Sequence, residues 1–499
     1  MPSLAELLRG SGPTQVFGRS DVEIKGLRHD SRHVVPGDLF FALPGAKTDG
    51  NRHVKDACAR VAVAVLSELA PPPPPAALGA AWVQAPDSLA AMGAVADAFF
   101  GRPSEAMKVI GVTGTNGKTT TTYFLESIVT SCGGLPAVAG TVNHRLGGRV
   151  LEKAANTTPI SLELLRLFAR FRDGGATHAA MEVSSHALAL KRVEKIAFDA
   201  AVFTNLSRDH LDFHKTQDSY FEAKAHLFEL LCRVDSPKKT RVAALNADDP
   251  RAPALKRRCV DCDVVLYGLK GDGLDLTARD LDLRLDGASF TLDFRGRRTP
   301  ARVALAGAHN VYNALASAAA ALGLGMPAEG VATGLGALRA VPGRLEPVEA
   351  GQKFHVFVDY AHTDSALETV LGHLSKLPHE RLITVVGCGG ERDRTKRGPM
   401  GVAACAASDI VFLTNDNPRG EDPLRILDDI EAGVKQSGLK NYKILPERAE
   451  AIEAAIAEAR EGDVVLIAGK GHEDYQILKD RTIHFDDRET ARAALAKRS

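Results

Sequence analysis

The residues best suited to chemistry form one short segment that follows an apolar run, residues 109–112. The segment reads Gly114-Thr115-Asn116-Gly117-Lys118-Thr119-Thr120. A turn of this kind between a strand and a helix points several backbone N–H groups at one spot, and the positive end of the helix dipole adds to them. Lys118 can reach the β- and γ-phosphates of a nucleotide, and the hydroxyl of Thr119 can bind Mg²⁺. The sequence therefore predicts a nucleotide-binding turn; a glycine-rich turn without phosphate is the weaker alternative.

This turn is a short form of the phosphate-loop pattern. The full pattern, G-x-x-x-x-G-K-[ST], would need glycine at position 112, where Val112 stands. The chain instead has G-x-x-G-K-T, which begins at Gly114. Glycine at 114 and 117 permits close approach of the backbone and dihedral angles that other residues avoid.

Two further clusters of polar residues follow apolar runs that are typical of strands. Glu182 closes the first run, and it is a candidate Mg²⁺ ligand opposite Thr119 because hard cations prefer oxygen donors. The second run leads into a loop with three ionisable side chains spaced two residues apart, His210, Asp212 and His214. This spacing favours a functional loop over an ordinary polar one, and by itself it also fits a transition-metal site. Open parallel sheets bind ligands at the carboxyl ends of their strands, so both clusters are expected near the turn.

Composition narrows the class of protein. The chain has 499 residues, 45% of them apolar and 25% charged, which is typical of a globular protein with about three domains. Its 62 basic and 62 acidic residues balance, which argues against a general nucleic-acid or membrane-surface binder. We expect no secretory signal and no membrane-spanning run of about 20 apolar residues. The cysteines, seven and scattered, fit a reducing cytoplasm.

One pair of cysteines has the spacing of metal ligands. Cys259 and Cys262 form a single C-x-x-C. Neither a second pair nor a nearby histidine completes a tetrahedral zinc site in the sequence, so we expect no structural metal there.

The order of apolar runs and turns predicts an α/β protein of three domains, residues 1–100, 101–340 and 341–499. The first two contain short strands and helices that alternate, which is the rhythm of a doubly wound parallel sheet. Asp286-Gly287 between two alternating runs predicts a hairpin over residues 280–294. The expected strands of the first two domains are 38–43, 61–66, 81–84, 179–183, 200–205 and 241–246, with helices at 89–100 and 310–322.

The third domain repeats the α/β rhythm. Its glycine-rich turn, residues 387–390, is not followed by Gly-Lys-Thr, so we expect no second nucleotide site there. Its expected strands are 354–358, 382–386, 410–413 and 464–467.

Several motifs of the central segment resemble those of the Mur ligase family, whose enzymes join amino acids to a UDP-linked muramyl peptide in cell-wall synthesis. They are the turn at 114–120, the cluster at 182–186, Thr204–His214, Tyr220-Phe221-Glu222-Ala223-Lys224 and Asn246-Ala247-Asp248-Asp249-Pro250. The resemblance covers essentially the whole chain. It continues through His309-Asn310, Pro342-Gly343-Arg344, Asp359-Tyr360-Ala361-His362 and Gly469-Lys470-Gly471-His472-Glu473.

The resemblance implies an N-terminal UDP-binding domain, a central P-loop ATPase domain and a C-terminal Rossmann-like domain that binds the amino acid. It implies a monomer that uses ATP and Mg²⁺ and forms an amide through an acyl phosphate, with neither nucleic acid nor membrane as a partner. Thr119 and Glu182 would hold one Mg²⁺, and His210 and Lys224 a second. An ammonium cannot bind a metal, so Lys224 would act as a carbamate formed with CO₂. Residues 114–120 would bind ATP together with Asn310, Asp359 and His362, at the seam between the second and third domains.

The resemblance also places the other substrates. The UDP end would lie at Ser31, Ala46, Lys47 and Thr48. The muramyl dipeptide would be held by Asn156, Thr157, Thr158, Ser184, Leu190 and Arg192. Leu190 stands where relatives often carry a glutamine and cannot donate the same hydrogen bond, whereas Arg192 suits a carboxylate.

Within the family, Asp30-Ser31-Arg32, Asn156–Pro159 and Asp416–Arg419 favour the members that add meso-diaminopimelate to the D-glutamate of UDP-N-acetylmuramoyl-L-Ala-D-Glu. Diaminopimelate carries a distal carboxylate beside its distal amine, so its pocket needs a cation and an anion. The expected pocket residues are Arg392, Asp416, Asn417, Pro418, Arg419, Gly469 and Glu473.

Three alternatives stay open: an L-lysine-adding member, a folylpolyglutamate-synthase-like ligase, and a non-catalytic nucleotide-binding regulator on the same scaffold. A separate first domain and Asp416–Arg419 argue against the second. Intact Lys118, Glu182, His210 and Lys224 argue against the third.

Overall fold

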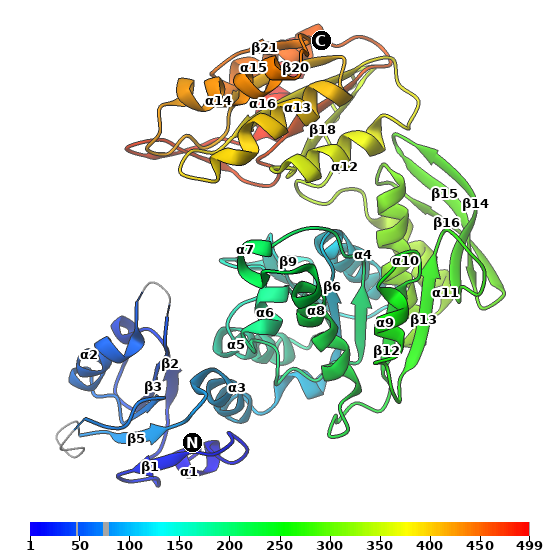
Figure 1. The fold of residues 1–499 in the computed structure, drawn as a ribbon. Helices are drawn as coiled ribbons and strands as arrows, with labels where there is room; N and C mark the ends of the chain where they lie inside the picture. Colours follow the sequence, from blue (N-terminus) through cyan, green and yellow to red (C-terminus); the bar gives the residue numbers. More distant parts are fainter. Residues whose placement is uncertain (46–47, 73–78, 499) are drawn as a thin grey trace. The chain divides into compact units, whose positions relative to one another are not determined.

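The computed structural model describes residues 1–45, 48–72 and 79–498, and it shows an α/β protein built on three large sheets (Figure 1). One sheet falls within each of the three predicted segments. By its internal contacts the chain divides into two compact units. The first unit contains residues 1–276 and 316–331, and the second contains 277–315 and 332–499.

The N-terminal sheet has the strand order β1-β5-β4-β3-β2 and is parallel except for β1. Successive residues of its buried strand β3 face opposite ways: Leu39 and Phe41 pack in one apolar cluster, and Phe40 and Ala42 in another. Burial on both faces explains why this strand is a continuous apolar run. The strands are β1 (Gln15–Phe17), β2 (Gly26–Arg28), β3 (Asp38–Ala42), β4 (Ala64–Ser67) and β5 (Ala81–Gln84).

The central strands of the first unit follow the order β13-β12-β11-β6-β10-β7-β8-β9. The pairs from β13 to β7 are parallel, and β8 and β9 extend the sheet with antiparallel pairs. The bounds are β6 (Lys108–Thr113), β7 (Pro136–Ala139), β8 (Asn143–Leu146), β9 (Arg149–Lys153), β10 (His178–Glu182), β11 (Ala200–Phe203), β12 (Val242–Asn246) and β13 (Asp263–Gly268).

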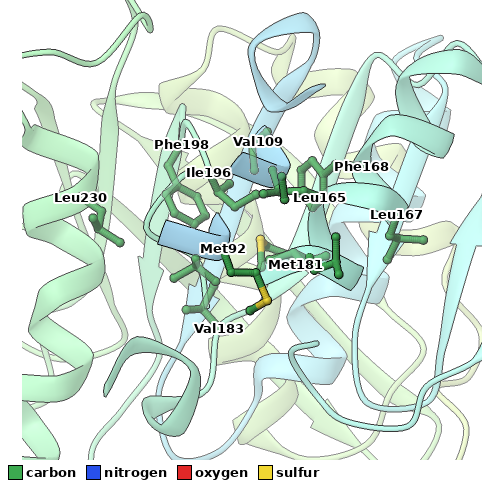
Figure 2. Close-up of a cluster of buried hydrophobic side chains, with 14 of the residues drawn as sticks. Met92, Val109, Leu165, Leu167, Phe168, Met181, Val183, Ile196, Phe198 and Leu230 are labelled. Carbon is green, nitrogen blue, oxygen red and sulfur yellow. The ribbon is translucent and has the colours of Figure 1, made fainter. Parts of the chain in front are cut away.

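Helices cover this sheet and bury an apolar core against it. Helix α4 packs on β6, β7 and β10, and α8 packs on β6, β11 and β12. Figure 2 shows part of the core, where side chains from α3, α5 and α8 meet those of β6 and β10. The helices are α1 (Leu4–Leu7), α2 (Val54–Ala59), α3 (Ser88–Phe99), α4 (Lys118–Ser131), α5 (Ser161–Asp173), α6 (Ser185–Ala189), α7 (Leu211–His214), α8 (Gln217–Cys232) and α9 (Ala252–Lys256), with 3-10 turns η1 (Ser31–His33), η2 (Gly50–His53) and η4 (Pro103–Ala106).

The second unit has a three-layer core. Its six-stranded sheet runs β17-β18-β22-β19-β20-β21, and alternate residues of its strands enter separate apolar clusters. Val464 and Leu466 pack with α12–α14, whereas Val465 and Ile467 pack with α15 and α16. The strands are β17 (Glu346–Pro347), β18 (His355–Asp359), β19 (Leu382–Cys388), β20 (Ile410–Asn415), β21 (Tyr442–Ile444) and β22 (Val464–Ala468), beside a small pair, β23 (Tyr475–Ile477) and β24 (Thr482–His484).

The remaining elements complete this unit and its link to the first. Helices α10 (Ala308–Gly323) and α11 (Ala328–Ala337) contain residues of both units. The other elements are β14 (Leu276–Arg284), β15 (Gly287–Phe294), β16 (Arg297–Val303), α12 (Asp364–Leu374), η5 (Arg394–Lys396), α13 (Arg397–Ala407), α14 (Pro423–Gln436), α15 (Arg448–Glu458) and α16 (Asp487–Ala496).

The structure confirms the predicted α/β class. The hairpin predicted at Asp286-Gly287 forms between β14 and β15, and Gly287 has φ +136°. A Cβ there would lie 2.0 Å from the carbonyl oxygen of Val303, so the turn requires glycine. The contacts group residues 277–315 with the C-terminal segment, while the boundaries at 100 and 340 stay a prediction. In the part of the chain that the structure describes, no helix is both long and apolar enough to cross a bilayer.

Candidate functional site

The turn that sequence predicts to bind phosphate, residues 114–117 and called the phosphate turn below, connects β6 to α4. Gly114 has φ +146°, and a Cβ on it would lie 1.9 Å from Oγ1 of Thr204. Gly117 has φ +90° and occupies the N-cap of α4, where no side chain caps the helix. Both glycines are therefore required by the backbone, and the helix start is left to an external anion.

Neighbouring strands β11 and β12 brace the phosphate turn through neutral hydrogen bonds. The N–H of Thr115 donates to the carbonyl of Asn205 at 2.8 Å, and the N–H of Asn116 donates to Oδ1 of Asn205 at 3.0 Å. Oγ1 of Thr204 donates to the carbonyl of Asn116 at 2.6 Å, and the Asn246 amide donates to the carbonyl of Thr204 at 2.7 Å. The conformation of the turn is therefore set without help from a ligand.

Two lysine ammonium groups converge on the phosphate turn. Nζ of Lys118 donates to the carbonyls of Gly114 and Thr115, both at 2.9 Å. Nζ of Lys224, from the buried face of α8, donates to the same Gly114 carbonyl at 2.8 Å and lies 4.4 Å from the ring centre of Tyr220. Burial lowers the pKa of Lys224 well below its usual range, and the positive charge of Lys118 lowers it further. Two lysine side chains from distant parts of the sequence thus meet at one backbone carbonyl.

A buried carboxylate lies beside the start of α4. Glu182, at the end of β10, is 1% exposed, and its Oε2 accepts a hydrogen bond from the Thr119 hydroxyl at 3.0 Å. The hydroxyl and N–H of Thr141 also donate to it, at 3.0 and 2.8 Å. Oγ1 of Thr141 in turn lies 3.1 Å from Oγ1 of Thr157. A carboxylate and a hydroxyl are hard oxygen donors, and the neutral groups around the carboxylate leave its charge for a cation, so these residues fit Mg²⁺.

The structure brings His210 and Lys224 to the same aromatic ring without a direct contact between them. The ring centre of His210 lies 6.0 Å from that of Tyr220 and 4.9 Å from that of His186. His210 is exposed and has φ +51° at the N-cap of α7. Burial raises the pKa of the Tyr220 hydroxyl to about 12, so this side chain stays uncharged at neutral pH.

The other two ionisable residues of that loop point elsewhere. His214 is buried, and its Nε2 lies 3.0 Å from Oγ of Ser185, whereas Asp212 is exposed. Among the residues described, the ligand atoms of His210, Asp212 and His214 do not gather within 4.8 Å of one another. The spacing of the three residues therefore does not build a transition-metal site.

Most of the predicted dipeptide-binding residues gather next to Glu182. The Thr158 hydroxyl donates to the carbonyl of Glu182 at 2.8 Å and lies 3.3 Å from Oγ of Ser184. Nη1 of Arg192 donates to the carbonyl of Thr158 at 2.8 Å, and Arg192 is only partly buried. Asn156 is exposed, and Leu190 is the partly buried C-cap of α6.

The predicted UDP-binding residues are only partly described. Ser31 is buried at the start of η1, and a polar pocket beside it is lined by Arg28, His29, Asp30, His33, Glu163 and Arg166. Thr48 is exposed. Ala46 and Lys47 lie outside the described residues.

Three predicted nucleotide-binding residues belong to the second unit. The buried amide of Asn310 donates to the carbonyl of Ala306 at 2.8 Å. Asp359, at the end of β18, accepts hydrogen bonds from two backbone N–H groups, at 2.8 Å each, and burial raises the pKa of its carboxyl. Nδ1 of His362 lies 2.7 Å from the carbonyl of Tyr360.

The predicted amino-acid pocket has a buried lysine at its centre. Nζ of Lys470 donates to Asn417 at 3.2 Å and to Asp416 and Glu473 at 3.4 Å. The Asn417 amide also donates to Glu473, at 3.0 Å. Lys470 is fully buried, so it orders three of the predicted residues and neutralises part of their charge.

The two predicted arginines differ in how firmly they are held. Nη1 of Arg419 donates to the carbonyls of Gly390 and Asn417, at 2.9 and 3.3 Å. Arg392 is exposed and makes no hydrogen bond or ion pair with the residues that the structure describes. Pro418 is buried. Gly469 has φ +119°, and its N–H donates to the carbonyl of Asp359 at 3.0 Å.

Sequence reasoning assigned no role to two residues that contact the candidate site residues, Thr141 and Lys470. Thr141 follows the buried strand β7, so the strand-end argument applied to Glu182 would have found it. Lys470 lies between two glycines directly after β22, and a lysine in that position was a signal of the same kind.

Comparison with known proteins gives matches along the whole chain. Profiles described as "Mur ligase family, catalytic domain", "Mur ligase middle domain" and "Mur ligase, glutamate ligase domain" match residues 23–100, 112–321 and 343–471. A relative from Solibacter usitatus named "UDP-N-acetylmuramoyl-L-alanyl-D-glutamate--2,6-diaminopimelate ligase" is 49% identical over 476 residues, which are 95% of this chain and 94% of the relative.

Two solved structures extend the comparison. One titled as a structure of a UDP-N-acetylmuramoyl-L-alanyl-D-glutamate--2,6-diaminopimelate ligase has a TM-score of 0.72 and 32% identity, and it covers 100% of this chain and 99% of its own. A folylpolyglutamate synthase from Mycobacterium tuberculosis has a TM-score of 0.62 at 18% identity over 81% of this chain and 94% of its own, a likeness of fold alone.

Proposed function

The chain belongs to the Mur ligase family, and we propose that it is an ATP-dependent, ADP-forming ligase that adds meso-diaminopimelate to UDP-N-acetylmuramoyl-L-Ala-D-Glu in peptidoglycan precursor synthesis. One observation carries the proposal. Lys118 and Lys224 both donate to the Gly114 carbonyl, beside the buried Thr119–Glu182 pair. This arrangement suits a transfer in which negative charge must be gathered and neutralised.

The reaction has two chemical steps. A carboxylate oxygen of the D-glutamate attacks the γ-phosphorus of ATP, the bond to ADP breaks, and an acyl phosphate forms. The amine then attacks the acyl carbon, phosphate leaves, and the amine loses a proton as the amide forms. Because the reactants are all anionic or polar, the protein's main task is to position them and offset their charge.

The phosphate turn and its lysine carry most of that task in our proposal. Residues Gly114–Gly117 offer backbone N–H groups and the start of α4, with Thr120 in its first turn. Nζ of Lys118 would leave the loop carbonyls for the β- and γ-phosphates, where it stabilises the charge that develops. Thr119 and Glu182 would hold Mg²⁺, which supplies further neutralisation of the phosphate charge.

Lys224 is proposed to act as a carbamate. Its lowered pKa and its burial favour the neutral amine, whose lone pair can attack CO₂; a new N–C bond forms and one proton is released. The carbamate is an oxygen donor, and with His210 it would hold a second Mg²⁺. The ring of Tyr220 lies near both side chains and lines this position.

The remaining substrate contacts are assigned by family resemblance and supported by their surroundings. Arg192, joined to Thr158, would bind a carboxylate of the muramyl dipeptide near Glu182 and Ser184. Asn156 and Thr157 would assist it, whereas an apolar Leu190 can offer only packing. Ser31 and the segment 46–48 would bind the UDP end, and Asn310, Asp359 and His362 the nucleoside and phosphates of ATP.

The amino-acid pocket favours diaminopimelate over L-lysine. Arg419 is held at one nitrogen by backbone carbonyls, which leaves its planar guanidinium oriented for the distal carboxylate, and Arg392 supplies a second cation. Glu473 and Asp416 supply anions for the amine. With L-lysine the arginines would face no carboxylate, and losing charged hydrogen bonds in such a site can cost about 10⁴-fold in discrimination. We also propose a cytoplasmic location and a monomeric state.

An assay of phosphate release separates the candidates. Purified protein is given ATP, Mg²⁺ and UDP-N-acetylmuramoyl-L-Ala-D-Glu with meso-diaminopimelate, L-lysine or no amino acid, and in parallel a folate substrate with glutamate. We expect release with diaminopimelate alone. Equal rates with L-lysine would contradict the amino-acid assignment, release with folate would favour the synthase-like ligase, and no release with any set would favour a regulator.

A further inference from the structure

Three cysteines from two segments of the chain meet beside the central sheet. Cys232 is the last residue of α8, and Cys259 and Cys262 lie in the short segment between α9 and β13. Their Sγ atoms all lie within 4.8 Å of one another, and those of Cys232 and Cys262 are 3.4 Å apart. Among the described residues no other group of three histidine, cysteine or acidic side chains gathers its ligand atoms so closely. We call this group the cysteine cluster.

The spacing of the three sulfur atoms suits a thiolate-bound metal ion. Zinc binds thiolates at about 2.3 Å, so two thiolates at adjacent corners of its tetrahedron lie about 3.8 Å apart. The observed separations, from 3.4 Å to at most 4.8 Å, bracket that value. Small side-chain rotations would therefore bring all three sulfurs to binding distance of one ion.

The surroundings hold the cluster together and offset its charge. Arg258, next to Cys259, pairs with Glu222 at 2.7 Å and with Glu229 at 3.2 Å, so this segment is tied to α8 independently of the cysteines. The positive charge of Arg241 acts on both Cys232 and Cys262. Its Nε is buried without a hydrogen-bond partner among the described residues, and such a donor suits a thiolate.

We propose that the cysteine cluster binds one thiophilic divalent metal ion of the zinc class through Cys232, Cys259 and Cys262. Each thiol releases its proton to solvent as its sulfur binds. The fourth position would be taken by water, since no histidine or carboxylate of the described residues joins the group. The ion would fasten the end of α8, the helix that carries Tyr220 and Lys224, to the start of β13.

The main competing possibility is a disulfide between two of the cysteines. A disulfide needs its sulfurs at about 2.05 Å, and it would leave the third thiol without a role. The cluster uses all three sulfurs at metal-ligand spacing, which is why the metal is the better assignment.

The test uses Co²⁺ as a spectroscopic probe of thiolate binding. The full chain, stripped of metal and kept reduced, is titrated with Co²⁺ and then with Zn²⁺. We expect thiolate-to-cobalt charge-transfer absorption that saturates at one ion per chain and disappears when Zn²⁺ is added. Cys232→Ser, Cys259→Ser and Cys262→Ser should each weaken binding at least tenfold, whereas Cys58→Ser and Cys132→Ser, which alter cysteines elsewhere, should not.

A second measurement covers variants that fail to fold. In the wild-type protein, Zn²⁺ should protect three thiols from alkylation, and peptide mass spectrometry should identify them as the cluster. Absence of the absorption band, a band unaffected by Cys232→Ser, or protection of other cysteines would overturn the proposal. So would a reduced protein that takes up no metal while the protein isolated without reductant contains a disulfide between Cys232 and Cys262.

Discussion

The molecule contains two glycine turns at the ends of buried parallel strands, and they differ in the groups that brace them. The phosphate turn follows the buried parallel strand β6 and leads into α4. Residues 387–390, the second glycine turn, contain the last two residues of the buried parallel strand β19 and the two that follow it, and they lead toward α13. In the phosphate turn, lysines donate to the carbonyls and the helix start has no side-chain cap. The first turn is thus arranged to receive an anion.

In the second glycine turn the side chains that donate to the backbone carbonyls are arginines, and one of them, Arg397, is paired with a carboxylate. Arg419 donates to the carbonyl of Gly390 at 2.9 Å, and Arg397 donates to that of Gly389 at 3.4 Å. Glu421 joins the group through Arg397 at 3.0 Å and Arg394 at 2.9 Å. A network of ion pairs therefore holds the second glycine turn in place. The carbonyl of Gly390 in this turn holds the guanidinium of Arg419, so we expect the turn to orient Arg419 and not to bind phosphate.

The difference shows that a strand, a turn and a helix supply a location but not a chemistry. The side chains around each turn and the charges they carry decide which ligand is accepted. Neutral hydrogen bonds with Thr204 and Asn205 brace the first turn, whereas ion pairs brace the second. The two turns should therefore respond differently to mutation, substrate and pH.

The largest effect is expected from removing the lysine that distinguishes the first turn. Lys118→Ala should lower the ligase rate about 10³-fold, because a positioned cation at the developing phosphate charge is lost. Steady-state phosphate release would measure it, with circular dichroism to check folding. Lys440→Ala, which alters an exposed lysine of the second unit, is the control. A Lys118→Ala enzyme whose rate of phosphate release stays within tenfold of the wild-type rate would contradict the proposed difference between the two turns.

Lys224→Ala should be the next most damaging change. We expect a loss of about 10²-fold, with part of the rate restored by short carboxylic acids that replace the missing oxygen donor. Rates with and without added acetate, in buffers depleted of CO₂, measure this. Full activity of the alanine variant without CO₂ would rule out the role, and an equal effect of acetate on the wild type would show that the rescue is not specific.

Arg419→Ala tests whether the second glycine turn helps to bind the amino-acid substrate. Loss of charged hydrogen bonds should raise the KM for meso-diaminopimelate about tenfold to a hundredfold while the KM values for ATP and the UDP-linked substrate change little. Arg425→Ala removes an exposed guanidinium of α14 outside this turn and serves as the control. A rise in the KM for ATP alone would place Arg419 with the nucleotide instead.

The smallest effect concerns the acid stability of the second turn. Its arginines, Arg394 first, lower the pKa of Glu421 to about 2, below the usual value of 4.5. The unfolded chain therefore binds more protons between these values, so the stabilisation is present above pH 4.5 and is lost as pH falls toward 2. Glu421→Gln should lower Tm slightly at pH 7 and flatten its decline below pH 4.5. Glu453→Gln, in an exposed pair with Lys497, should change neither, and identical acid profiles for all three proteins would contradict this account.

The first turn could be predicted from the sequence because its chemistry is local. Glycines, lysine and threonine stand side by side, and an apolar run precedes them. The contacts that tune it are not local: Lys224 meets Gly114 only because α8 packs on β6, and Thr141 meets Glu182 only because β7 pairs with β10.

Two other features could not be predicted from the sequence, because they also depend on how the chain folds. The spacing of His210, Asp212 and His214 by itself also fits a transition-metal site, but the fold buries His214 against Ser185 and exposes Asp212. Cys232 is separated from the C-x-x-C pair by more than twenty residues, so only the fold shows that it joins them. Spacing along a loop says little about direction unless a strand or helix fixes it.

The central claim is that the first turn activates a carboxylate as an acyl phosphate. The most direct test follows the oxygen: UDP-N-acetylmuramoyl-L-Ala-D-Glu labelled with ¹⁸O in the reacting carboxylate is converted with ATP and meso-diaminopimelate, and the released phosphate is analysed by mass spectrometry. Because the attacking oxygen leaves with the phosphoryl group, the account predicts one oxygen from the carboxylate in each phosphate. Phosphate that carries no label, with amide still formed, would contradict it.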